Sequence, residues 1–184
     1  KFLHPGPGFG GSCFPKDTRA LIKIGEHYDT DMSLVREVVR INEKQRSRMI
    51  EKLERLLGSL QGKKICALGI AFKAETDDIR ESPAVDIIKI LLQKGAQVNL
   101  HDPQALENAK KLFENAVNYY EDMYQAMKDC DAIVILTEWN AYRNLALEKA
   151  KSLLKQKIIF DTRNVLDPET CHQTGFLYEG VGRR

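Results

Sequence analysis

The residues best suited to covalent chemistry lie near the start of the sequence, in the segment Gly6-Pro7-Gly8-Phe9-Gly10-Gly11-Ser12-Cys13-Phe14-Pro15-Lys16-Asp17. Four glycines in the six positions from Gly6 to Gly11 let the backbone turn sharply and approach a ligand closely, because glycine has no Cβ. A neighbouring ammonium group, such as that of Lys16, or the N-terminus of a following helix stabilises the thiolate form of a cysteine. The pattern favours a nucleophilic Cys13 over the simpler interpretation, a glycine-rich turn that carries an inert buried cysteine.

The bulk properties are those of an ordinary globular chain. The 184 residues carry 28 basic and 26 acidic side chains, which are well mixed and give a net charge of +2. The sequence therefore lacks the clustered basic charge that is typical of nucleic-acid-binding proteins. No apolar run approaches the roughly 20 residues that cross a bilayer. Four separated cysteines without metal-site spacing indicate a cytoplasmic protein with reduced thiols and no metal. Cys66 and Cys130 lie in apolar contexts and are expected to be structural.

Residues 18–58 have the pattern of two helices, which must connect the cysteine loop to the rest of the chain. The first is expected from Thr18 to Tyr28, and the second from Ser33, as its N-cap, to Leu57, with Gly58 as a stop signal. Apolar residues on one face of the second helix are Leu34, Val38, Ile41, Met49, Leu53 and Leu56. This helix is either a core helix of one domain or an interdomain spine whose apolar stripe faces a second subunit.

From Lys63 onward, short apolar runs alternate with helical segments. The expected strands are residues 64–69, 97–100, 117–120, 132–136, 157–160 and 176–178. Ser82-Pro83 predicts a helix start, and Asp102-Pro103 opens another helical stretch. The alternation predicts an α/β fold: a long helical spine followed by a Rossmann-like, doubly wound, mostly parallel sheet. The expected units are a cysteine loop at 1–17, helices at 18–58 and the sheet domain at 59–184.

The sheet lacks the usual signature of a dinucleotide site. Its first strand is followed by Gly69-Ile70-Ala71-Phe72-Lys73, which is not the Gly-x-Gly-x-x-Gly pattern that binds a pyrophosphate. Asp102 follows the second strand, where a ribose-binding acid would stand. Without the glycine pattern, we interpret Asp102 as a turn residue at the strand end.

The cysteine segment closely resembles the catalytic-cysteine motif of the UDP-glucose/GDP-mannose dehydrogenase family. The resemblance continues, in the family's order, through residues 69–73 (GIAFK), 77–83 (DDIRESP), 137–139 (TEW) and 160–163 (FDTR). It implies that a preceding NAD-binding domain is absent from this chain, which would be a C-terminal portion and inactive alone. It also implies that the sheet domain holds mainly the nucleotide-sugar.

The resemblance assigns roles to individual residues. Cys13 matches the nucleophile that attacks an aldehyde at sugar C6 to form a thiohemiacetal, then a thioester, and Asp17 matches an acid that manages protons and the hydrolytic water. Residues matching the nucleotide-sugar site are Phe2, Leu3, His4, Pro5, Gly6, Pro7, Gly8, Phe9, Gly10, Phe72, Lys73 and Arg163. Residues matching positions near NAD are Cys13, Phe14, Pro15, Lys16 and Arg80. Trp139 either lines the cleft or caps the core.

The same resemblance narrows the substrate. Ser12 and Lys16 favour the UDP-glucose or GDP-mannose branch over UDP-N-acetylhexosamines, and the Pro7–Gly10 loop favours UDP-glucose, oxidised to UDP-glucuronate with two NAD⁺. The expected partner is a second copy of the chain through the 33–57 helix, with neither nucleic acid nor membrane. The alternatives are another nucleotide-sugar dehydrogenase, or a non-catalytic UDP-binding or dimerisation module.

Overall fold

The computed structural model describes residues 4–183, and the site predictions at Phe2 and Leu3 lie outside these residues. Its centre is a six-stranded sheet in which every ladder is parallel, with the strand order β3-β2-β1-β4-β5-β6. The strands are β1 (Lys64–Leu68), β2 (Gln97–His101), β3 (Asn118–Tyr119), β4 (Ala132–Ile135), β5 (Ile158–Asp161) and β6 (Leu177–Gly180). The predicted doubly wound sheet is confirmed, and it is wholly parallel.

The central strands β1 and β4 are almost continuous apolar runs, as expected where helices cover both faces of a parallel sheet. In β1 the side chains from Ile65 to Leu68 are fully buried, and β4 is buried throughout. The helices of the sheet domain are α3 (Pro83–Gln93), α4 (Leu106–Phe113), α5 (Met123–Met127), α6 (Asn140–Arg143), α7 (Leu147–Leu153) and α8 (Pro168–Gln173). Ser82 caps α3 as predicted, since its Oγ accepts a hydrogen bond from the Ala84 N–H at 3.2 Å.

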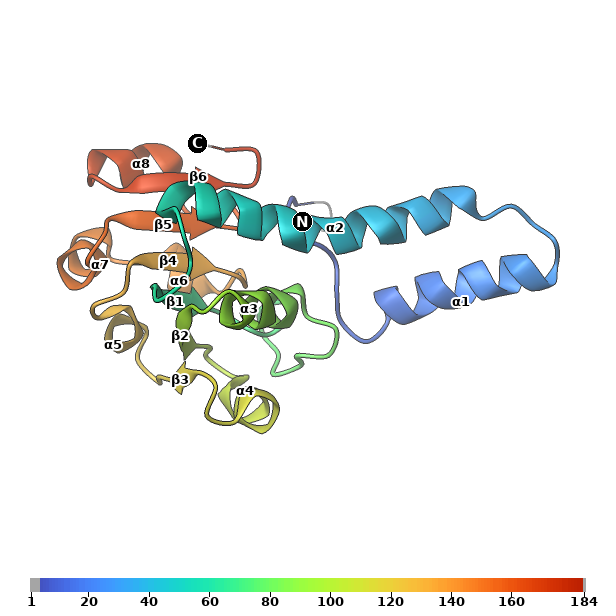
Figure 1. Ribbon diagram of the computed structural model, residues 1–184, viewed down its shortest axis with the longest axis horizontal. Helices are drawn as coiled ribbons and strands as arrows, with labels where there is room; N and C mark the ends of the chain where they lie inside the picture. Colours follow the sequence, from blue (N-terminus) through green and yellow to red (C-terminus); the bar gives the residue numbers. More distant parts are fainter. Residues whose placement is uncertain (1–3, 184) are drawn as a thin grey trace.

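Two further helices, α1 (Phe14–His27) and α2 (Ser33–Leu57), form a hairpin that projects from the side of the sheet domain (Figure 1). The C-terminal half of α2 packs on α3, and its Met49 and Leu53 belong to the core. The N-terminal half instead exposes Leu34, Val38 and Ile41, by 77%, 43% and 47%. The predicted single apolar face is therefore divided: one half is core, and the other is an exposed stripe. In residues 4–183 no helix combines the length and apolarity that crossing a bilayer requires.

Two predicted helix starts were wrong. Helix α1 begins at Phe14 rather than Thr18, because Pro15 is tolerated in the first turn, where no helical N–H partner is required. Asp17 therefore lies within the first turn of α1, and its N–H donates to the Cys13 carbonyl at 2.8 Å. Ser33 is the first residue of α2 and not its cap: the Asp31 carboxylate accepts from the Ser33 N–H at 2.8 Å and from its hydroxyl at 3.0 Å.

Candidate functional site

The carboxyl ends of the strands form the edge at which open α/β sheets bind ligands, with β1 and β4 at the point where the strand order reverses. The loop after β1 carries Phe72 and Lys73, the loop after β4 carries Glu138, and the loop after β5 carries Arg163. Phe72 is half-buried and Lys73 is exposed, with its Nζ 5.3 Å from the centre of the Phe72 ring.

The glycine-rich segment docks against this edge. A Cβ atom built on Gly11 would lie 2.7 Å from the Phe72 ring, and one built on Gly6 would lie 3.2 Å from Nη1 of Arg163. The fold thus brings the cysteine loop together with Phe72 and Arg163, which lie far along the sequence. His4 and Pro5 are exposed at the start of the described loop, and Pro7 is buried.

Gly10 sits against the start of α3. A Cβ atom there would overlap the carbonyl oxygen of Glu81 and lie 2.6 Å from Cδ of Pro83. Glu81 itself has a left-handed backbone, with φ of 48°, and its carboxylate accepts from Nη1 of Arg19 on α1 at 2.9 Å. The glycines therefore serve close contacts with this chain's own elements.

Cys13 lies at the N-terminus of α1, in the N-cap position, and is exposed. The other three cysteines are buried, and burial raises the pKa of the Cys66 thiol, of Cys130 to about 12 and of Cys171 to about 11. Among the four, Cys13 is the thiol that solvent and small molecules can reach. The structural interpretation of Cys66 and Cys130 is confirmed.

The charged groups predicted near the cofactor surround this end of α1. The Lys16 ammonium pairs with the Asp17 carboxylate, and both are exposed; that pairing raises the pKa of Lys16. Arg80 is also exposed, and its hydrogen bonds to Asp78, at 2.7 to 3.2 Å, raise its pKa. The charge of an ionised Cys13 adds a smaller contribution to both shifts, so both cations lie within electrostatic reach of the thiol.

Glu138 lies at the candidate site, although the sequence reasoning gave it no role there. Its carboxylate pairs with Nη2 of Arg163, and both side chains are largely shielded from solvent. The Arg163 backbone is held as well, because its N–H donates to the Asp161 carboxylate at 3.0 Å. Burial raises the pKa of Asp161. The available signal was its position in the sequence: Glu138 lies in the loop just after β4, at the same edge of the sheet as Arg163.

The loop after β1 does not fit a dinucleotide pyrophosphate. Oδ2 of Asp102 accepts from the N–H groups of Ile70 and Ala71 at 2.8 and 3.1 Å, so these amides are already engaged. The same oxygen lies 3.3 Å from the Trp139 ring nitrogen, and Oδ1 accepts from the N–H groups of Gln104 and Ala105. Asp102 is thus a buried turn residue, as predicted. Trp139, 4% exposed, caps the core.

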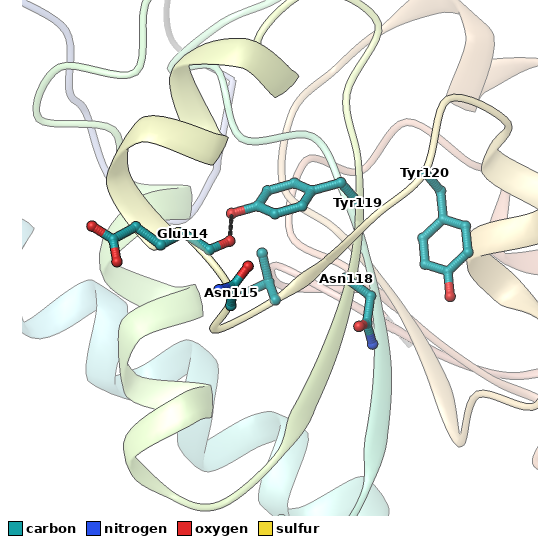
Figure 2. Close-up of a pocket in the computed structure, with 6 residues that line it drawn as sticks. Glu114, Asn115, Asn118, Tyr119 and Tyr120 are labelled. Atoms are coloured by element: carbon teal, nitrogen blue, oxygen red, sulfur yellow. Dashed lines mark hydrogen bonds between the residues drawn. The ribbon is translucent and has the colours of Figure 1, made fainter.

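One hollow of about 510 Å³ lies away from this edge, where α4 leads into β3 (Figure 2). Tyr119 crosses it and donates its hydroxyl to the Glu114 carbonyl at 2.9 Å. None of the predicted site residues lines it. A second hollow, of about 170 Å³, lies between the cysteine loop and α2 and includes Phe9, Asn42 and Glu81. Within residues 4–183, no cluster of His, Cys, Asp and Glu side chains is arranged to hold a metal ion.

Two family profiles match the chain: the UDP binding domain of the UDP-glucose/GDP-mannose dehydrogenase family at residues 66–168, and the central domain of the same family at residues 1–44. Among curated proteins, the UDP-glucose 6-dehydrogenase TuaD of Bacillus subtilis is 45% identical over 183 residues, and the UDP-glucose 6-dehydrogenase of Rhizobium meliloti is 42% identical over 184. Each alignment covers 100% of this chain but only 40% and 42% of the relative.

Solved structures of nucleotide-sugar dehydrogenases also match almost the whole of this chain. A UDP-glucose dehydrogenase from Pyrobaculum islandicum matches with a TM-score of 0.85 and 37% identity, over 97% of this chain and 39% of that one. A GDP-mannose dehydrogenase from Pseudomonas aeruginosa matches with a TM-score of 0.78 and 28% identity, over 98% and 41%. The chain thus spans about two fifths of the length of the proteins it resembles.

Proposed function

Since the chain belongs to the UDP-glucose/GDP-mannose dehydrogenase family, we propose that it is the C-terminal part of an NAD-dependent UDP-glucose 6-dehydrogenase that forms UDP-glucuronate. The observation that carries the proposal is the docking of the Cys13 loop beside Phe72 and Arg163. The loop that carries the exposed Cys13 thus contacts, through Gly11 and Gly6, an aromatic and a cationic side chain that suit a nucleotide-sugar. Alone, without a hydride-acceptor site, the chain is expected to be inactive.

In the proposed reaction, Cys13 acts on the aldehyde that the first oxidation produces at C6 of the sugar. Its Sγ forms a bond to C6, and the former carbonyl oxygen takes a proton, which gives a thiohemiacetal. Loss of hydride from C6 and of the hydroxyl proton gives a thioester, and water then displaces Sγ to leave the carboxylate. NAD⁺ supplies the hydride acceptor for both oxidations, so each turnover consumes two NAD⁺ and one water.

Asp17 is proposed to handle protons during these steps. Its place in the first turn of α1, four residues after Cys13, puts its carboxylate on the same side of the helix as the nucleophile. It can accept the proton of the attacking water or orient that water toward C6. The Asp17 carboxylate also pairs with the Lys16 ammonium, and both side chains are exposed to solvent.

Lys73 and Arg163 are proposed to bind the diphosphate, with Phe72 packing against the nucleotide-sugar. An ammonium serves a phosphate as a point charge, and a guanidinium can contact two of its oxygens at once. His4, Pro5 and residues 6–10 are proposed to wrap the sugar. Phe2 and Leu3 remain proposed members of the same loop.

The cofactor is proposed to reach Cys13 from a domain outside this chain. The β1–α3 loop does not fit its pyrophosphate, because Asp102 engages the amides. Two exposed cations near the thiol, Lys16 at the start of α1 and Arg80 on the β1–α3 loop, are proposed to contact this negatively charged ligand together with Phe14 and Pro15. To do so, each cation would exchange or share its present carboxylate partner, Asp17 or Asp78.

A second copy of the chain is the proposed partner. The exposed stripe of Leu34, Val38 and Ile41 is an apolar surface on a projecting helix, and burying such a surface against its own copy would stabilise a dimer. Light scattering on the complete protein decides this: a monomeric mass would rule the dimer out.

Turnover assays of the complete protein test the function. We expect NADH formation with UDP-glucose at a kcat/KM at least about tenfold above that with GDP-mannose or UDP-N-acetylmannosamine, which corresponds to about 1.4 kcal/mol of discrimination. The reverse order would favour a different nucleotide-sugar dehydrogenase, a class to which structures at about 28% identity belong. No turnover with any of the three would favour a non-catalytic module.

The proposed binding of the diphosphate by Lys73 and Arg163 can be tested separately from turnover. Lys73→Ala and Arg163→Ala should each weaken UDP binding to the complete protein by about tenfold or more, because each removes a charged partner of the diphosphate. Isothermal titration with UDP measures this effect. Lys111→Ala, an exposed cation on α4, is the matched control and should bind UDP like the wild type. Equal affinity in all four proteins would remove Lys73 and Arg163 from the site.

A further inference from the structure

Two amide side chains on α2 clamp the cysteine loop. Oδ1 of Asn42 accepts from the Phe9 N–H at 2.7 Å, and Nδ2 of Asn42 donates to the Phe9 carbonyl at 3.1 Å. One turn further along, Nε2 of Gln45 donates to the Gly6 carbonyl at 3.1 Å. Asn42 and Gln45 are three residues apart and half-buried, so one face of α2 holds the loop at two points, Gly6 and Phe9.

The loop is shaped for this clamp. Gly8 has φ of 120°, which L side chains rarely adopt, and a Cβ atom there would lie 2.7 Å from Oδ1 of Asn42. A side chain at position 8 would therefore displace Asn42 from the Phe9 N–H. The sequence of the loop and the identity of residue 42 are mutually adapted, although they lie on different elements.

The clamp connects to the nucleophile through Phe9. The rings of Phe9 and Phe14 pack edge to face with their centres 4.9 Å apart, and Phe14 directly follows Cys13. Residues 4–13 form no helix or strand that could fix their backbone. A rigid helix holds Phe9 through both of its backbone polar groups, and Phe9 in turn packs against the residue next to Cys13.

We propose that Asn42 is a positioning residue for Cys13, with Gln45 as its second support; this rests on the proposed function. The Asn42 side chain bonds the Phe9 backbone and not the thiol, so it acts by fixing the backbone from which Cys13 reaches C6. In the proposed reaction only the steps after aldehyde formation use the thiol. Loosening the clamp should therefore slow acid formation more than the first oxidation, so that aldehyde escapes.

The experiment compares Asn42→Ala, Gln45→Ala and the control Lys44→Ala in the complete protein. Lys44 is exposed on the same turn of α2, so its replacement tests the general effect of alanine on this helix. Asn42→Ala should lower the rate of UDP-glucuronate formation about 10- to 100-fold, the scale of a displacement of about 1 Å at a reacting group. The NADH formed per UDP-glucuronate should rise above two, since each released aldehyde leaves one NADH without an acid.

Hydrogen–deuterium exchange supplies a readout that does not depend on activity. In Asn42→Ala the amides of residues 6–13 should exchange at least about tenfold faster, while those of β1 and β4 keep their wild-type rates. Asn42→Asp retains the acceptor but loses the donor to Phe9, so the exchange rates of residues 6–13 in this variant should lie between those of the wild type and Asn42→Ala. The Asp variant keeps the proposal testable if the alanine variant misfolds. Gln45→Ala should show a smaller effect in the same direction.

If the amides of residues 6–13 exchanged at the wild-type rate in Asn42→Ala, the proposal that Asn42 holds the loop would be wrong. Faster exchange with an unchanged rate and an NADH-to-acid ratio still at two would overturn its role in positioning Cys13. Equal losses in both oxidations, with faster exchange in β1 and β4, would make Asn42 a merely structural residue. If the wild-type protein does not oxidise UDP-glucose, the proposed function fails, and the exchange data still decide whether Asn42 holds the loop.

Discussion

Replacing Cys13 with alanine in the complete protein should lower the rate of UDP-glucuronate formation at least about a thousandfold, because the variant has no group that can form the thiohemiacetal or the thioester. The first oxidation does not use the thiol in the proposed reaction. NADH formation should therefore persist at a reduced level, with aldehyde and not acid as the product. Acid is measured by chromatography of the UDP-sugars, and NADH by its absorbance.

The matched control is the same substitution at a buried thiol. Cys171 lies on α8, at the opposite end of the molecule from α1 (Figure 1), and its burial raises its pKa to about 11. Cys171→Ala should keep acid formation within a few-fold of wild type. Iodoacetamide at about pH 8 should alkylate Cys13 before the three buried thiols. If Cys13→Ala formed acid at the wild-type rate, Cys13 would not be the nucleophile, and the proposed covalent route through a thiohemiacetal and a thioester would be wrong.

Gly10→Ala should lower acid formation on the order of 100-fold while leaving the sheet domain folded. The added Cβ would overlap the Glu81 carbonyl and crowd Pro83 at the start of α3, and neither backbone segment can move aside easily. The loop can relieve the overlap by lifting off the domain, which displaces Cys13 by about an ångström or more. Steady-state kinetics and the thermal unfolding midpoint, measured on the same preparation, separate these effects.

Gly62→Ala is the matched control for Gly10→Ala. Gly62 precedes β1, at the amino end of the strands, and a Cβ atom there would meet nothing within 4 Å. Its φ of 72° makes alanine cost about 1 kcal/mol of stability without touching the loop. We expect Gly62→Ala to lower the unfolding midpoint and keep kcat, the reverse of Gly10→Ala. Full activity in Gly10→Ala would mean that acid formation does not depend on the observed position of the loop against the start of α3.

Much of the fold could be predicted because its signals are local. A buried parallel strand shows itself as an apolar run, as in residues 64–68, and a proline after a serine marks a helix start, as at Ser82 and Pro83. The interpretation of Asp102 also rested on local information, the absence of a glycine pattern before it. Helix starts were harder to predict: Pro15 lies in the first turn of α1, before the expected start at Thr18, and Asp31 rather than Ser33 supplies the acceptor at the start of α2.

By itself, the sequence determined the element order, the parallel sheet, the family resemblance and the identity of the candidate nucleophile, because each depends on residue types at short, regular spacings. Only the tertiary structure decided what the glycines of the cysteine loop contact, and that Glu138 pairs with Arg163 and Asn42 holds Phe9. It also decided that the apolar face of α2 is half core and half exposed. These are contacts between residues distant in sequence, and periodicity specifies which face of an element is apolar but not what lies opposite it.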